Sequence, residues 1–127
     1  MAIECQIDHD RRMVFARGLG TLTDQDFFGY QREVWSRTDV AGYDELMDMS
    51  DVTEIALPSC ARVRNLATLS ATMDDRRSNS KFAIVAPNDL AFGLGRMYQT
   101  YREMNESSTK KVGVFRSMED ALHWLER

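Results

Sequence analysis

The feature of this 127-residue sequence that most constrains its fold is a short, uninterrupted apolar run, KFAIVAP at residues 81–87. Its length fits a β-strand, and turn-forming residues lie on both sides of it. Successive side chains of a strand point to opposite faces of a sheet, so a run that is apolar throughout is usually covered on both faces. Such strands are typical of parallel sheets, whose connecting helices cover both faces. The run therefore predicts an α/β protein.

The first 22 residues have the pattern of a β-hairpin. Ile3, Cys5 and Ile7 alternate with polar residues, which indicates a half-buried strand. The turn-forming segment DHDRR leads into a second strand, in which Gly18 and Gly20 mark a bend or an end.

Helix and strand patterns alternate after the hairpin. Thr23 with Asp26, Asn88, and Ser117 with Asp120 are capping residues that predict helix starts. One hairpin followed by alternating units predicts a mostly parallel five-stranded sheet with about four helices, joined by right-handed crossovers. The expected elements are a hairpin at 2–22, helices at 23–38, 59–73, 90–105 and 118–127, and strands at 43–50, 81–87 and 110–115.

The composition fits one domain over residues 1–127. A net charge of −4 argues against a nucleic-acid or anionic-membrane partner, since either would need a basic surface. The opening MAIECQIDHDRR lacks the basic start and apolar run of a signal peptide, and no apolar stretch is long enough to cross a membrane.

The two cysteines, Cys5 and Cys60, match no metal or redox spacing. We expect a cytoplasmic protein with free thiols, no cofactor and no stable membrane insertion.

Several segments resemble known families. DMSDVTEI (48–55), ahead of a predicted helix, resembles the hallmark of STAS domains, the family of bacterial anti-sigma factor antagonists. The hairpin start, FGLGRMYQTYREM after KFAIVAPND, and VFRSMEDALHWLER at the end resemble the SpoIIAA-like group of small bacterial proteins. This second resemblance covers nearly the whole chain. It implies a compact STAS-like α/β domain without catalysis, with a fold near that of Sec14-type lipid-binding domains.

The antagonist pattern is Asp-Leu-Ser-x-Val-x-x-Ile-Asp-Ser-Ser-Gly, and this chain departs from it at the end. Asp48, Ser50, Val52 and Ile55 match, but the final four positions read Ala-Leu-Pro-Ser at 56–59.

The resemblance places Pro58, which has no hydroxyl, at the position of the phosphorylated serine. Only a one-residue slip would give Ser59 that role. We therefore expect a degenerate phosphoswitch.

Ser59 has two interpretations. A phosphate on Ser59 would meet the free N–H groups and the positive end of a helix. Alternatively, Ser59 caps this helix and stabilises it by about 1 kcal/mol. The capping role ranks first.

Cys60 shares this helix start, where a thiol pKa can be lowered. Arg62 and Arg64 are near it in sequence, but His9 and His123, which could act as bases, are not. We expect a small buried residue rather than a nucleophile.

Carboxylates crowd around the strand expected at 43–50. Asp48, Asp51 and Asp89 are the candidates for a cation site at the carboxyl ends of the strands. Solvated charges explain the group better, so no metal site is predicted. The carboxylates are Asp44, Glu45, Asp48, Asp51 and Glu54.

Methionine and aromatic residues give the chain a deformable apolar interior. Eight methionines accompany six phenylalanines, four tyrosines and two tryptophans. Flexible thioethers fill core gaps, and they also suit pockets for irregular apolar ligands. The candidate pocket residues are Met47, Met49, Leu94, Met97, Tyr98 and Tyr101.

Three functions follow, in order of preference. The first is a non-enzymatic, STAS-like binding or regulatory module with a protein partner. The second is a carrier or sensor of a small hydrophobic ligand such as a lipid. An enzyme that uses Cys60 or the carboxylates ranks last, because no nucleophile–base set is evident.

A homodimer through helix faces or the hairpin edge fits any of these functions. The expected partner surface comprises Ser50, Asp51, Leu57, Ser59, Cys60 and Arg62.

Overall fold

The structure, a computed structural model, describes residues 2–56 and 59–126. In chain order the elements are β1 (Ile3–Asp8), β2 (Met13–Thr23), α1 (Asp24–Trp35), the 3-10 helix η1 (Thr38–Val40), β3 (Asp44–Ala56), α2 (Cys60–Thr72), β4 (Lys81–Val85), α3 (Asp89–Glu103), β5 (Lys111–Phe115) and α4 (Met118–Leu125).

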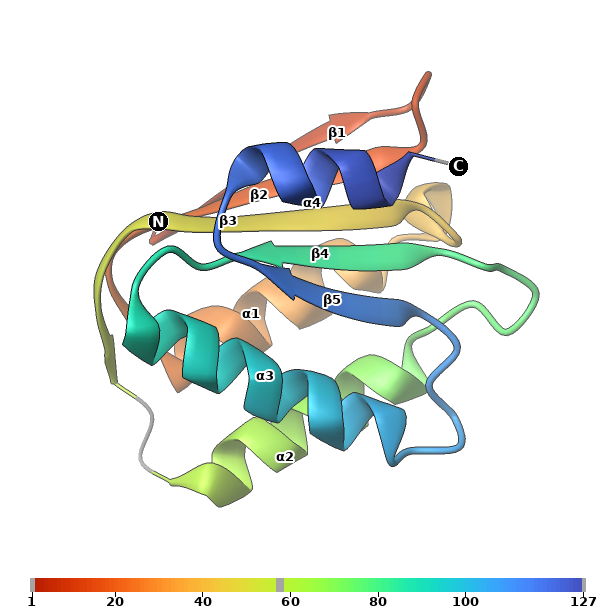
Figure 1. Ribbon diagram of the computed structural model, residues 1–127. Coiled ribbons are helices and arrows are strands. Elements are labelled where there is room, and N and C mark those ends of the chain that lie inside the picture. The colour runs from red at the N-terminus through yellow and green to blue at the C-terminus, as the bar shows by residue number, and fades with distance from the viewer. Residues whose placement is uncertain (1, 57–58, 127) are drawn as a thin grey trace.

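Within the described residues, five strands form one sheet in the order β1-β2-β3-β4-β5. β1 and β2 are antiparallel, as expected for a hairpin, and the other neighbours are parallel. Each parallel connection contains a helix and steps in the same direction across the sheet. Right-handed crossovers therefore place α1, α2 and α3 on one face, and α4 lies on the other (Figure 1). The predicted fold class is confirmed.

β4 is the apolar run that indicated this fold, and it is covered on both faces. Phe82 and Ile84 belong to the larger core under α1, α2 and α3. Ala83 and Val85 alternate with them and pack with Leu46 in a second core under α4. Both faces of the central sheet are thus sealed.

Two glycines accommodate the bend of β2 against β3. The β2–β3 register shifts between Arg17 and Leu19 and again after Gly20, which has a φ of 65°. A Cβ on Gly18 would lie 2.7 Å from Cγ2 of Val52, so only glycine permits this close approach.

The expected helix caps at Thr23, Asn88 and Ser117 are confirmed. Each side chain accepts a hydrogen bond from a backbone N–H in the first turn of its helix, and Asp26 completes a capping box with Thr23.

The expected end of the third strand, at Ser50, is wrong. β3 continues to Ala56, because β2 extends alongside it and pairs Leu22 with Ile55 and Thr23 with Ala56. The sequence also did not predict the 3-10 helix η1. Ile3 is buried and Ile7 is partly buried, as expected for one face of β1, but Cys5 between them is exposed.

Candidate functional site

An apolar cavity of about 80 Å³ lies between the sheet and the three helices on its larger-core face. Its walls come from α1, β3, α2, β4 and α3. Met47 and Met49 of β3, with Leu94 and Tyr98 of α3, are in the lining, as the sequence indicated.

Met97 and Tyr101, the other two predicted pocket residues, do not line the cavity. They are partly buried and pack against the same core. A helix turns by about 100° per residue, so Met97 lies to one side of the face of α3 that carries Ala91 and Tyr98. Tyr101 lies further along the helix than Tyr98, the last residue of α3 in the lining.

The mouth of the cavity lies where α1 and α2 begin. Nε of Arg62 donates a hydrogen bond to Oδ2 of Asp24 at 2.9 Å. The Arg62 guanidinium also stacks over the Phe28 ring, 4.4 Å from its centroid. The Arg62 side chain is 38% exposed and that of Asp24 is 18% exposed, so this pair meets solvent.

The opposite end of the cavity is closed by a buried polar network centred on Glu45. Its carboxylate accepts hydrogen bonds from the Tyr30 hydroxyl (2.7 Å), Trp35 Nε1 (3.2 Å) and Lys110 Nζ (3.2 Å). The Lys110 ammonium also lies 3.4 Å from the centroid of the Trp35 ring. Burial lowers the pKa of Lys110, although Glu45 acts in the opposite direction. Burial and the charge of Glu45 both raise the pKa of Tyr30 well above its usual value.

A second buried ion pair holds this network in place. Arg102 donates to Asp74 and to the Tyr98 hydroxyl, each at 2.6 Å. Asp74 also accepts the backbone N–H groups of Thr109 and Lys110. Every buried side-chain polar atom in the described part of the chain has a partner. The closed end therefore offers no free polar group, and a ligand would meet mainly apolar surface there.

Glu45 overturns one sequence expectation. The carboxylates around the third strand were interpreted as solvated charges, but Glu45 is only 3% exposed. In a strand, Glu45 lies on the same face as Met47 and Met49, and this alternation could have indicated its burial. Asp48 instead binds the backbone and hydroxyl of Ser50.

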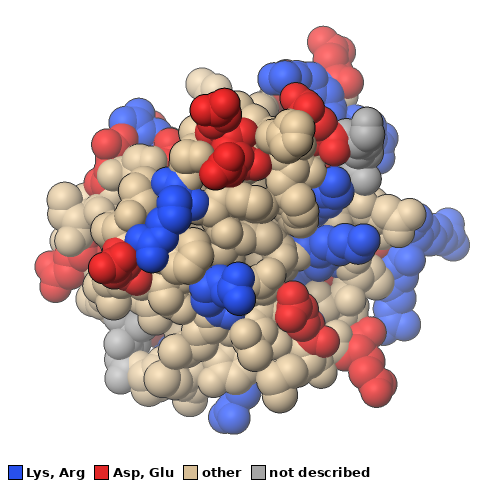
Figure 2. All heavy atoms as spheres, in the orientation of Figure 1, with Lys and Arg blue, Asp and Glu red and all other residues tan. Residues whose placement is uncertain are grey.

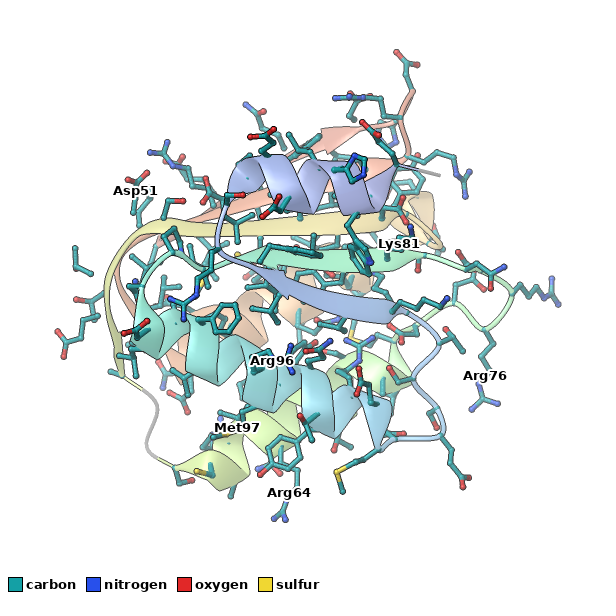
Figure 3. All side chains as sticks on the ribbon, viewed as in Figure 1. Asp51, Arg64, Arg76, Lys81, Arg96 and Met97 are labelled. Carbon is teal, nitrogen blue, oxygen red and sulfur yellow. The ribbon has the colours of Figure 1, made fainter. Side chains whose placement is uncertain are left out.

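The described residues of the expected partner surface lie in two separate places. Ser50 and Asp51 are exposed on β3, where Asp51 pairs with Arg17. Ser59 and Cys60 are exposed at the start of α2. Five residues separate Asp51 from the end of β3, roughly 16 Å along an extended strand. Figure 3 accordingly shows Asp51 well away from the start of α2. Leu57 lies outside the described residues, as does Pro58, the expected switch position.

The start of α2 differs from its predicted form in two respects. Ser59 occupies the N-cap position, but its side chain makes no capping hydrogen bond. Cys60 is exposed rather than buried, because it is the first residue of the helix.

No catalytic set surrounds Cys60 within residues 2–56 and 59–126. His9 bonds the Tyr43 hydroxyl, and His123 faces Glu126 on α4. Among the described residues, neither histidine is hydrogen-bonded to a cysteine or serine. In the same residues no group of three or more His, Cys, Asp or Glu side chains could hold a metal ion.

On the face drawn in Figure 2, acidic and basic side chains are interspersed, and no broad area carries one sign. In the part of the chain that the structure describes, no helix is long and apolar enough to cross a membrane.

Comparisons with known proteins bear on the fold. No family model matches the chain, and no curated protein does. A similar solved structure is an uncharacterized protein from the DUF3478 family with a SpoIIAA-like fold, from Shewanella loihica PV-4. The two share 17% sequence identity with a TM-score of 0.61, over 98% of this chain and 94% of the other. The chain therefore has a SpoIIAA-like fold, and the expected resemblance is confirmed for the fold.

Proposed function

We propose that this protein is a non-enzymatic binding module that carries or senses a small apolar molecule. The observation that carries the proposal is the apolar cavity between sheet and helices, with its polar groups already bonded at one end and solvent at the other. Ligand sites are typically concave and mainly apolar, with few polar groups.

The size of the cavity limits the ligand. At about 80 Å³ it has roughly half the volume of an engineered ~150 Å³ cavity that binds benzene. Met47 and Met49 are unbranched and flexible, so they can repack to enlarge it. We expect short apolar chains to bind, and longer ones only where the methionines move.

Native mass spectrometry of freshly purified protein tests for a co-purifying apolar ligand. Thermal unfolding with 1-alkanols of four to eight carbons then tests binding directly. A ligand at 100 times its Kd stabilises the folded state by about 2.7 kcal/mol, which raises the Tm of a domain of this size by about 10 °C.

A matched pair of variants locates the site. Leu94→Trp fills the cavity and should abolish the rise in Tm. Leu90→Trp, at a 58% exposed position on the same helix, should preserve it. If no adduct is found and no alkanol raises the Tm, the proposal is wrong.

A second candidate is a regulatory module that binds a protein through the start of α2. The SpoIIAA-like fold and the exposure of Ser59 and Cys60 favour it. Because a proline stands at the switch position, we expect no phosphate on Ser59 after incubation in a lysate with ATP. Phosphopeptide mapping that found stoichiometric modification there would contradict this expectation.

Location and assembly are further parts of the proposal. Two free cysteines suit the reducing cytoplasm. β1 forms an edge of the sheet, where a second copy could pair to give a homodimer. Light scattering during size-exclusion chromatography would reveal the dimer mass.

A further inference from the structure

We infer that the ligand has an anionic, oxygen-bearing head group that binds Arg62 at the mouth while its apolar tail enters the cavity. A carboxylate and a phosphate monoester share this chemistry. The inference rests on the proposed function, because it assigns the class of molecule held at the same site.

The first argument is the hydrogen-bonding state of Arg62. A guanidinium has five N–H donors arranged as a planar fork. Among the described residues, the bond from Nε to Asp24 is the one that this guanidinium makes. Within residues 2–56 and 59–126, neither Nη atom of Arg62 donates to a protein group. Two parallel N–H groups are therefore available to an incoming carboxylate or phosphate.

The second argument is that the fork is held in position. Its stacking on Phe28, together with the bond to Asp24, fixes the guanidinium plane before a ligand arrives. A preorganised arginine loses less conformational freedom on binding than a mobile surface side chain does.

The third argument is continuity between the head site and the cavity. Arg62, Asp24 and Phe28 all contribute to the lining. Val63, the next residue on α2, is buried in that lining. A molecule with its head at Arg62 can thus extend its tail over apolar surface towards Met49.

Other head groups fit the mouth less well. A cationic head would have to displace Arg62 from Asp24 and would face the arginine charge. A neutral hydroxyl would accept only one of the two available N–H groups. The carboxylate of Asp24 repels an anion, but it is already bonded to Arg62, which offsets its charge.

The test compares head groups on one tail. Hexanoate, hexyl phosphate, 1-hexanol and hexylamine are titrated into the full-length protein by calorimetry. We expect hexanoate and hexyl phosphate to bind about ten-fold more tightly than 1-hexanol, since a charge-assisted bidentate pair at a partly exposed site is worth about one factor of ten. The advantage should shrink as ionic strength rises. The relative affinities of the two anions then distinguish a carboxylate from a phosphate ligand.

Variants assign the effect to Arg62. Arg62→Met keeps an apolar stem and should remove the ten-fold preference, because it weakens the binding of hexanoate far more than that of 1-hexanol. Arg64→Met is the matched control, because Arg64 lies on the same helix but extends away from the molecule in Figure 3. It should alter neither affinity. If Arg62→Met does not fold, Asp24→Asn gives the second test: the preference for hexanoate over 1-hexanol should rise a few-fold, because a repelling carboxylate is removed.

The outcomes separate the two proposals. If neither hexanoate nor hexyl phosphate binds the unmodified protein more tightly than 1-hexanol does, the inference is overturned and the proposed function stands. Tightest binding of hexylamine would also overturn it, and would assign recognition to Asp24. If none of the four compounds binds, the proposed function and the inference both fail.

Discussion

Glu45 and Lys110 form an ion pair that is almost completely shielded from water. Their side chains are 4% and 6% exposed, and each has a further partner in Trp35. Removing two charges from water costs free energy that a close ion pair only partly recovers. The loss of one member should therefore lower the free energy of unfolding more than the replacement of both by apolar residues does.

Replacing Glu45 alone should be strongly destabilising. Glu45→Met leaves the Lys110 charge buried without its carboxylate, at a cost of about 3–5 kcal/mol in the free energy of unfolding. The double variant Glu45→Met/Lys110→Met should be about 2 kcal/mol more stable than the single one, because no charge remains buried. Urea unfolding measures both. Asp51→Asn, in the exposed pair with Arg17, is the control and should have a much smaller effect, because solvent screens that pair. If Glu45→Met and Asp51→Asn lowered the free energy of unfolding equally, the argument that Glu45 and Lys110 are shielded from water would be refuted.

Tyr30 makes stability depend on pH in the alkaline range. Burial and Glu45 raise its pKa well above the usual value of 10.0 in the folded protein. Above pH 10 the unfolded chain ionises this phenol while the folded protein does not. The contribution of Tyr30 to stability is thus fully present below pH 10 and is lost as pH rises above it, at up to about 1.4 kcal/mol per pH unit.

The free-energy cost of Tyr30→Phe should therefore shrink as the solution becomes alkaline. Between pH 9.5 and pH 11 we expect the difference in unfolding free energy from the unmodified protein to fall by about 1 kcal/mol. Urea unfolding at a series of pH values provides the measurement. Val63→Ala, a core change without an ionisable group, should show a constant difference. A Tyr30→Phe cost that stayed constant or grew would mean that the phenol is not shielded as described.

At the scale of the element, the helix starts differ in how they are capped. Asn88 and Ser117 accept first-turn N–H groups, whereas the Ser59 side chain makes no capping bond. Asn88→Ala and Ser117→Ala should each cost about 1 kcal/mol in unfolding free energy, and Ser59→Ala less than about 0.5 kcal/mol. Chemical denaturation of the three variants tests this ranking. A loss at Ser59 equal to that at Asn88 would restore the capping role expected from the sequence.

Elements were predictable where local chemistry determines them. The apolar run of β4 and the capping residues Thr23, Asn88 and Ser117 carry their signals within a few neighbours. The length of β3 was not predictable, since the residues from Asp51 to Ala56 do not alternate regularly between polar and apolar and are held as a strand by pairing with β2. Such pairing is a long-range property, which a local pattern does not contain.

The site was partly predictable for the same reason. The periodicity of β3 and α3 identified Met47, Met49, Leu94 and Tyr98, which the structure brings together. Arg62 was expected at a partner surface, but its pairing with Asp24 at the cavity mouth was not predictable. These two residues are 38 apart in the sequence and become neighbours only when parallel strands align their carboxyl ends.

At the scale of the whole molecule, two cores share one sheet, and each contains or borders one tryptophan. Trp35 belongs to the core under α1, α2 and α3, and Trp124 packs against the core under α4. Adjacent residues of one strand, such as Leu46 and Met47, enter opposite cores. Neither face can lose its packing without disturbing the strands that the other requires.

We therefore expect the two faces to unfold together, as is usual for a single domain of this size. In Trp35→Phe only Trp124 reports by fluorescence, and in Trp124→Phe only Trp35 does. In each variant the urea midpoint from fluorescence should coincide with the midpoint from far-ultraviolet circular dichroism, because the sheet links the two cores. The two midpoints are compared within one variant, so a difference in stability between the two variants does not affect the comparison. A Trp124 signal that changed at lower urea than the dichroism would mean that α4 detaches first, and that the larger core, with its cavity, is stable without it.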